Sequence, residues 1–180
     1  MSMQKPLAKP SFMKPDEASL EAVDVRTGRG EAEAQFELGL EFANAGGNQN
    51  EAQAAQYYLK AATQNHIGAQ VNLSVMYAKG RGVRRDEAQS LLWLSKAAHL
   101  GDPEAQYTLG MRQNRISMDQ EPQPGGELRI EAYKWLRLAA AQVYPEAETG
   151  CDFVSMGMTR EGVIEGNRRA AAFAADDRTS

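Results

Sequence analysis

Residues 69–101 read AQVNLSVMYAKGRGVRRDEAQSLLWLSKAAHLG, two apolar runs on either side of a basic segment that contains two glycines. In the first run Ala69, Leu73 and Tyr77 recur every four residues, the spacing that places side chains on one face of a helix. In the second run Trp93 precedes an Ala-Ala pair by four positions, which is also helical spacing. The stretch therefore predicts two helices joined by a short turn.

The middle of this stretch, KGRGVRRDEA at residues 79–88, raises the alternative of a loop that cradles phosphate. A Walker loop needs GxxxxGK and then Ser or Thr after a buried strand, and a dinucleotide fingerprint needs GxGxxG within a βαβ unit. Because neither pattern is present, we interpret the segment as a turn between a helix ending near Ala78 and one beginning near Asp86. Val83 would fill the gap between the helices, and Asp86 would cap the second one. The basic residues are interpreted as a solvated surface, with a site for an acidic partner as the alternative.

Both helical patterns recur along the chain. Ala-Gln followed by an apolar and then a small residue is anchored by Ala34, Ala69 and Ala105, with a further anchoring alanine at Ala147. An aromatic residue four positions before an Ala-Ala pair occurs three times, as Tyr57, Trp93 and Trp135. The end of each Ala-Ala pair is always seven residues from the next anchoring alanine. This period predicts an all-α stack of helix pairs, in which small residues such as Gly39 allow close approach and the aromatic residue fills the wider part of the wedge.

The repeated unit resembles the Sel-one-like repeat family, relatives of tetratricopeptide repeats, through the pattern A-x-x-x-L-G-x-x-Y-x-x-G-x-G-V-x-x-D-x-x-x-A-x-x-W-x-x-x-A-A-x-x-G. Residues from Ala69 to Gly101 follow it, with Ser74 and Ser90 as departures. The first repeat lacks the GxGV segment, and the third replaces the turn with a longer insert. The resemblance implies a right-handed α-solenoid of antiparallel helix pairs, which serves as a scaffold for protein contacts without catalysis.

The chain is accordingly divided into a tail, repeats and a cap. The predicted units are a tail at 1–29 with a short capping helix at 16–27, repeats over 30–157 (30–65, 66–101, 102–143 and a half repeat at 144–157), and a C-terminal capping helix at 158–177.

The joints between successive pairs carry helix-end signals. Gly101 and Asn65 suit a left-handed residue after a helix, and Asp102 can cap the helix that follows. Val143 and Tyr144 do not fit this rule, so the third joint is expected to be built differently.

Two other segments depart from the regular repeat. In the C-terminal helix, Thr159 is expected to cap the N-terminus and Phe173 to dock on the stack, while Arg169 stays in solvent. The polar insert SMDQEPQPGGELR at 117–129 is expected to interrupt the helix. It is read equally well as a partner-contact loop or as a tolerated insertion.

No catalytic or metal-binding pattern is found. His66 and His99 occupy different slots of the repeat without an HExxH companion, and Cys151 is expected to be a small core residue. We therefore predict no cofactor, no metal and no catalytic residue. A net charge of −4 disfavours nucleic acid and anionic membranes as partners. The first fifteen residues lack the apolar run of a signal peptide, so a cytoplasmic location is expected.

Residues of the first helix in each pair that lie opposite its packing face would line a concave groove. These are Phe36, Leu40 and Asn44, then Val71, Val75 and Lys79, then Tyr107, Met111, Asn114 and Arg115, and finally Phe153. Each apolar member is read equally as groove or as core between repeats, whereas Asn114 and Arg115 are expected to be exposed contacts. An apolar stripe flanked by amide and basic groups suits an amphipathic helix or an extended acidic peptide.

The sequence thus predicts a non-enzymatic scaffold or adaptor, a monomer or weak homodimer, that binds a protein or peptide in this groove. Two alternatives stay open: a helical-repeat RNA-binding protein, and a regulatory subunit that contributes to an enzyme site.

Overall fold

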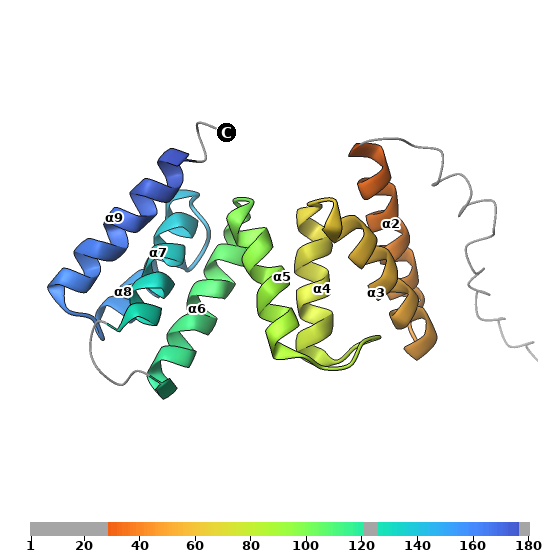
Figure 1. Ribbon diagram of the computed structural model, residues 1–180, viewed down its shortest axis with the longest axis horizontal. Helices are drawn as coiled ribbons and strands as arrows, with labels where there is room; N and C mark the ends of the chain where they lie inside the picture. Colours follow the sequence, from red (N-terminus) through yellow and green to blue (C-terminus); the bar gives the residue numbers. More distant parts are fainter. Residues whose placement is uncertain (1–28, 121–125, 177–180) are drawn as a thin grey trace, which may run out of the picture.

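The computed structural model describes residues 29–120 and 126–176, and these residues form helices and connecting turns without any strand (Figure 1). The helices are α2 (Arg29–Ala45), α3 (Asn48–Thr63), α4 (Ile67–Lys79), α5 (Glu87–His99), α6 (Pro103–Gln120), α7 (Glu127–Ala141), α8 (Ala147–Ser155) and α9 (Arg160–Asp176). The predicted tail and the capping helix at 16–27 lie outside the described residues.

The helices pack as successive pairs, α2 with α3, α4 with α5, and α6 with α7. The second helix of each pair also packs against the first helix of the next, so that the pairs stand side by side in chain order (Figure 1). Three apolar clusters run through the stack, one after another along the chain. The predicted all-α repeat fold is confirmed.

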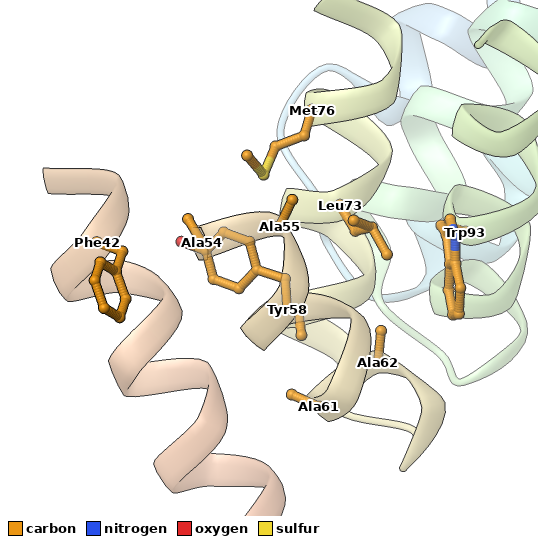
Figure 2. Packing of buried hydrophobic residues seen from close by; sticks show 10 residues of the cluster. Phe42, Ala54, Ala55, Tyr58, Ala61, Ala62, Leu73, Met76 and Trp93 are labelled. Carbon is orange, nitrogen blue, oxygen red and sulfur yellow. The ribbon is translucent and has the colours of Figure 1, made fainter. Parts of the chain in front are cut away.

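Within a pair, close approach depends on small residues, as predicted, and the residues that these small residues meet lie one position after the repeated aromatic residue. A Cβ atom added to Gly39 would lie 2.5 Å from the Tyr58 ring, and one added to Gly110 would lie 2.8 Å from Leu136. The repeated aromatic position lies one residue earlier. Tyr57 stacks on the Phe42 ring of α2 at 5.4 Å between centroids, and Trp93 lies in one apolar cluster with Leu73 of α4 (Figure 2). Tyr57 and Trp93 therefore pack with the first helix of their own pair, as predicted.

The three joints between pairs share one backbone conformation. In each, the backbone amide three residues after the last helical residue donates to the carbonyl of the first alanine of the Ala-Ala pair. The bonds are His66 to Ala61 (3.1 Å), Asp102 to Ala97 (3.2 Å) and Tyr144 to Ala139 (3.2 Å). The residue before each donor is left-handed, with φ of 64° at Asn65, 88° at Gly101 and 58° at Val143.

The third joint was predicted to differ from the other two. This prediction was wrong for the first residues of the joint and right for its last residues. Val143 adopts the left-handed conformation although a β-branched residue disfavours it. The end differs because α8 begins only at Ala147, after a left-handed Glu146 that provides no side-chain cap. In the second joint, Asp102 accepts a hydrogen bond from the Ala105 amide at 2.7 Å, as predicted.

A glutamine beside the anchoring alanine closes the first two joints. Gln70 donates to the Ala62 carbonyl and Gln106 to the Ala98 carbonyl, both at 3.1 Å. These carbonyls lie at the end of the preceding helix, where no intrahelical donor remains.

In two of the three pairs, the glutamine beside the anchoring alanine accepts a hydrogen bond from a second glutamine, which directly follows the second helix of the pair. The side-chain amide of Gln64 donates to Gln35 at 2.8 Å, and that of Gln142 donates to Gln106 at 2.9 Å. In the middle pair the equivalent position holds Leu100. The Gln70 Oε1 atom is consequently buried without a hydrogen-bond partner in the described part of the chain.

The insert in the third repeat interrupts the helices less than predicted. Helix α6 continues to Gln120 and α7 begins at Glu127, so both flanks of the 117–129 insert are helical. Ser117 is fully buried, and its hydroxyl donates to the Asn114 carbonyl at 2.8 Å. Asn114 itself is only 5% exposed, so the prediction of an exposed contact there was wrong.

Helix α9 packs on α7 rather than pairing with α8 (Figure 1). Thr159 caps it as predicted, because its hydroxyl accepts the Gly162 amide at 3.1 Å. Phe173 meets the Trp135 ring edge-on, at 5.4 Å between centroids. Gly166 lies against the Tyr133 ring, where an added Cβ would approach to 2.7 Å. The last helix therefore covers the outer side of α7.

Arg169 corrects a second prediction about this helix, since it is not left in solvent. Its guanidinium donates to Glu127 and to Glu131 on α7, and to Glu165 on its own helix. Hydrogen bonds from Arg168 and Arg169 lower the pKa of Glu165 to about 2. The cluster joins α9 to α7 by charge as well as by apolar contact.

Candidate interaction surface

The predicted groove residues divide by burial into two sets. Leu40 and Val75 are each 36% exposed, and Asn44, Lys79 and Arg115 are also exposed. The second set is half-buried and consists of Phe36, Val71, Tyr107 and Met111. Phe153, on α8, is 52% exposed.

The half-buried set takes part in packing between repeats. The Phe36 ring stacks on His66 at 4.3 Å between centroids, and Tyr107 lies 5.3 Å from Tyr144. Val71 packs against the second apolar cluster. Since these contacts join neighbouring helices, the core interpretation accounts for the half-buried set, and the exposed set is what remains for a partner.

Leu40 and Val75 border a notch of about 200 Å³ between α2 and α4. The notch is lined by Leu40, Ala43, Glu51, Tyr58, Asn72, Val75, Met76 and Arg81. Tyr58 and Met76 are buried members of the first core cluster, so the floor of the notch is rigid. The structure thus provides an apolar recess with two partly exposed aliphatic side chains at its edge.

One wall of the notch is polar. Arg81 donates through Nε (3.0 Å) and Nη2 (2.8 Å) to the same oxygen of Glu51. Burial raises the pKa of the Tyr58 phenol, against the opposing effects of a hydrogen bond with Asn72 and the Arg81 charge. The phenol is therefore neutral at neutral pH. Sequence reasoning missed this wall, because Glu51 and Arg81 are far apart in the chain and belong to different repeats.

The titratable residues that the sequence singled out have structural roles. His66 caps α4, because its Nδ1 accepts the Ala69 amide at 3.1 Å, and its Nε2 therefore carries the proton, which it donates to Glu33 at 3.0 Å. Cys151 is buried as predicted, and burial raises the pKa of its thiol to about 11. No group of three potential metal ligands occurs among residues 29–120 and 126–176.

Whether a helix can cross a membrane depends on its length and polarity. Within the described ranges, every helix is too short or too polar to traverse a lipid bilayer.

Comparison with known proteins places this geometry in a family. The profile described as Sel1 repeat matches residues 32–66, 67–102 and 125–144. A Sel1 repeat protein from Oxalobacter formigenes is 33% identical over 76% of this chain and 96% of its own, with a TM-score of 0.59.

A second solved structure is a protective antigen of uropathogenic Escherichia coli strains that displays an SLR fold. It matches 87% of this chain with a TM-score of 0.70 and 23% identity, which shows a common fold. This chain spans 32% of the length of that structure. A search of curated proteins finds no match. The matched repeats, the joints they share and the Oxalobacter relative together show that the chain belongs to the Sel1 repeat family.

Proposed function

We propose that this chain is a non-enzymatic scaffold that binds a protein or peptide partner along the face formed by α2, α4 and α6. The Sel1 repeat fold commonly mediates contacts between proteins. The observation that carries the proposal for this chain is the notch, because Leu40 and Val75 stay partly exposed over a closely packed aromatic floor. Apolar side chains of a partner gain most where a rigid recess excludes water around them.

The proposed partner segment is an amphipathic helix or an extended peptide with acidic residues. Lys79 and Arg115 stand at equivalent positions of α4 and α6 and are exposed, and no contact with another described residue occupies either charge. One apolar side chain of the partner would enter the notch, while its acidic groups would face these cations. The apolar anchor supplies affinity, and the charges set orientation.

A pull-down compares a variant of the notch with a control variant that introduces the same charge elsewhere on the surface. Val75→Glu places a charge at the notch, whereas Leu92→Glu places the same charge on α5, at a residue that is 46% exposed and outside the notch. Captured proteins are quantified by mass spectrometry, and helicity is checked by circular dichroism. We expect Val75→Glu to reduce capture about thirtyfold, the effect of losing an anchor worth ~2 kcal/mol. Equal recovery of every captured protein by the two variants would refute the proposal.

A further inference from the structure

The turn between α4 and α5 borders two further hollows, which share no residue with the notch. One, of about 200 Å³, is apolar and includes Leu59, Leu73 and Val83. The other, of about 660 Å³, is open and includes Arg84 and Arg85. Because Tyr77 and Val83 line both, the two hollows adjoin and form one continuous surface.

The turn that carries this surface is held firmly in place. Gly80 and Gly82 are left-handed, with φ of 70° and 67°. A Cβ atom at Gly82 would lie 2.2 Å from the Glu51 carbonyl oxygen, so the turn touches the backbone of α3 directly. At its other end the Asp86 amide donates to the Tyr77 carbonyl at 3.0 Å. Side chains on this turn are therefore presented from a fixed backbone.

Most residues of the turn have structural roles, but its two adjacent arginines do not. Val83 packs against the core, and Asp86 accepts the Gln89 amide at 3.0 Å to cap α5. Arg84 and Arg85 are exposed and make neither a hydrogen bond nor an ion pair with any described residue. The carboxylate that lines the hollow with them is that of Asp86, which is already engaged. Two guanidinium groups without an ion-pair partner among the described residues thus stand beside an apolar recess.

We propose that these two hollows form a second docking surface, separate from the notch, for a peptide segment that carries an apolar side chain next to acidic residues. The apolar side chain fills the recess beside Leu59, which is 41% exposed. The carboxylates of the segment bind Arg84 and Arg85, whose planar guanidinium groups match carboxylate geometry. A scaffold with two such surfaces holds two partners at once.

The observations favour an acidic peptide over nucleic acid. The aliphatic recess accepts a side chain such as leucine, whereas single-stranded nucleic acid is held by bases stacked on exposed aromatic rings. Tyr77, the aromatic residue that lines both hollows, is half-buried against the core. The formal net charge of −4 also opposes a phosphate backbone, while two local cations are sufficient for a short acidic segment.

The test uses the full chain and two fluorescein-labelled decapeptides, with binding measured by fluorescence anisotropy. One peptide has a central leucine followed by two glutamates in a serine-glycine background, and the other has glutamines in place of the glutamates. We expect the glutamate peptide to bind about five- to tenfold more tightly at low salt, as expected for two exposed ion pairs. Added salt should remove this preference. Leu59→Ser should weaken both peptides equally, and Leu92→Ser should weaken neither.

Charge-matched variants show whether the arginines of the turn are responsible. Arg84→Gln with Arg85→Gln should abolish the preference for glutamate, whereas Lys96→Gln with Arg160→Gln, which changes the net charge equally at two exposed residues outside both surfaces, should preserve it. Equal binding of both peptides, no binding of either, or an equal loss in the two double variants would overturn the inference. Tighter binding of a labelled oligouridine to the same surface would also overturn it. Loss of the peptide with Val75→Glu would place it in the notch, which overturns the second surface and leaves the proposed function standing.

Discussion

Leu100 occupies the position where the other two joints carry a supporting glutamine, and Leu100→Gln should therefore stabilise the protein. The Gln70 Oε1 atom is buried without a partner among the described residues. At the equivalent positions of the other two pairs, Gln64 donates to Gln35 Oε1 at 2.8 Å and Gln142 donates to Gln106 Oε1 at 2.9 Å. Because the joints share one backbone conformation, a glutamine at position 100 can reach Gln70 in the same way.

The expected gain is the difference between two terms. Supplying a donor to an unsatisfied buried acceptor contributes about 1 kcal/mol. Leu100 is already 43% exposed, and glutamine keeps two methylenes, so the lost apolar burial costs less than about 0.5 kcal/mol. A net gain of roughly 0.5–1 kcal/mol follows, which raises the Tm of a domain of this size by about 1–4 °C.

Urea unfolding followed by circular dichroism and by tryptophan fluorescence measures this difference, provided that the two transitions coincide. A cycle with Gln70→Leu separates the hydrogen bond from the lost burial, and the coupling free energy should be about 1 kcal/mol. Gln142→Leu is the mirror experiment, since it leaves the buried Gln106 oxygen without its amide donor and should destabilise by a similar amount. A coupling indistinguishable from zero, or an unchanged stability in Gln142→Leu, would refute the reasoning.

Three further predictions use single sites. Gly82→Ala should lower the free energy of unfolding, measured in urea, by more than about 2 kcal/mol, because the strain of a left-handed alanine adds to a clash with the Glu51 backbone. Gly101→Ala introduces the same strain but its Cβ meets open space, so it should cost only about 1 kcal/mol. The arginines on α9 lower the pKa of Glu165 from 4.5 to about 2, so this carboxylate contributes stability above pH 4.5 that is lost as the pH falls towards 2. Arg169→Met should flatten the stability–pH curve in that range, and an equally steep curve would contradict the role of the cluster. Burial raises the Cys151 pKa by two units to about 11, so alkylation by iodoacetamide at pH 8 should be about a hundredfold slower than in urea, and equal rates would contradict it.

Much of the fold could be predicted because its signals are local. The helix ends at Ala78 and Asp86 were placed within a residue, since the glycines, Val83 and the capping aspartate all lie within one turn. Val143 was misread because residue preference was the only guide. In the structure, the hydrogen bond from the Tyr144 amide to the Ala139 carbonyl fixes the backbone of the joint. Val143 therefore adopts the left-handed conformation, which costs a β-branched residue roughly 1–2 kcal/mol.

Features that depend on distant residues could not be predicted. Ser117 stands in a polar stretch that reads as a loop, yet it is buried in the stack and helical. Asn114 was expected on the exposed face of its helix and is buried. Arg169 finds its partners on α7, far away in the sequence, and no pattern on its own helix points to them. For the proposed interaction surface, periodicity placed Phe36 and Leu40 together on one face of α2 but could not separate exposed Leu40 from half-buried Phe36.

The shared backbone of the joints has a consequence for how such a chain can change. The turn inside a pair occupies residues 46–47 in the first repeat and 80–86 in the second, while the joints on either side keep their hydrogen bond. Spacing along the stack is thus insulated from the length of the inner turns. New recognition segments can be inserted most freely where a turn meets open space, as at Gly46 and Gly47, whereas the 80–86 turn has to keep its contact with α3. Turns of the first kind are natural points of diversification for evolution and of grafting for the protein engineer.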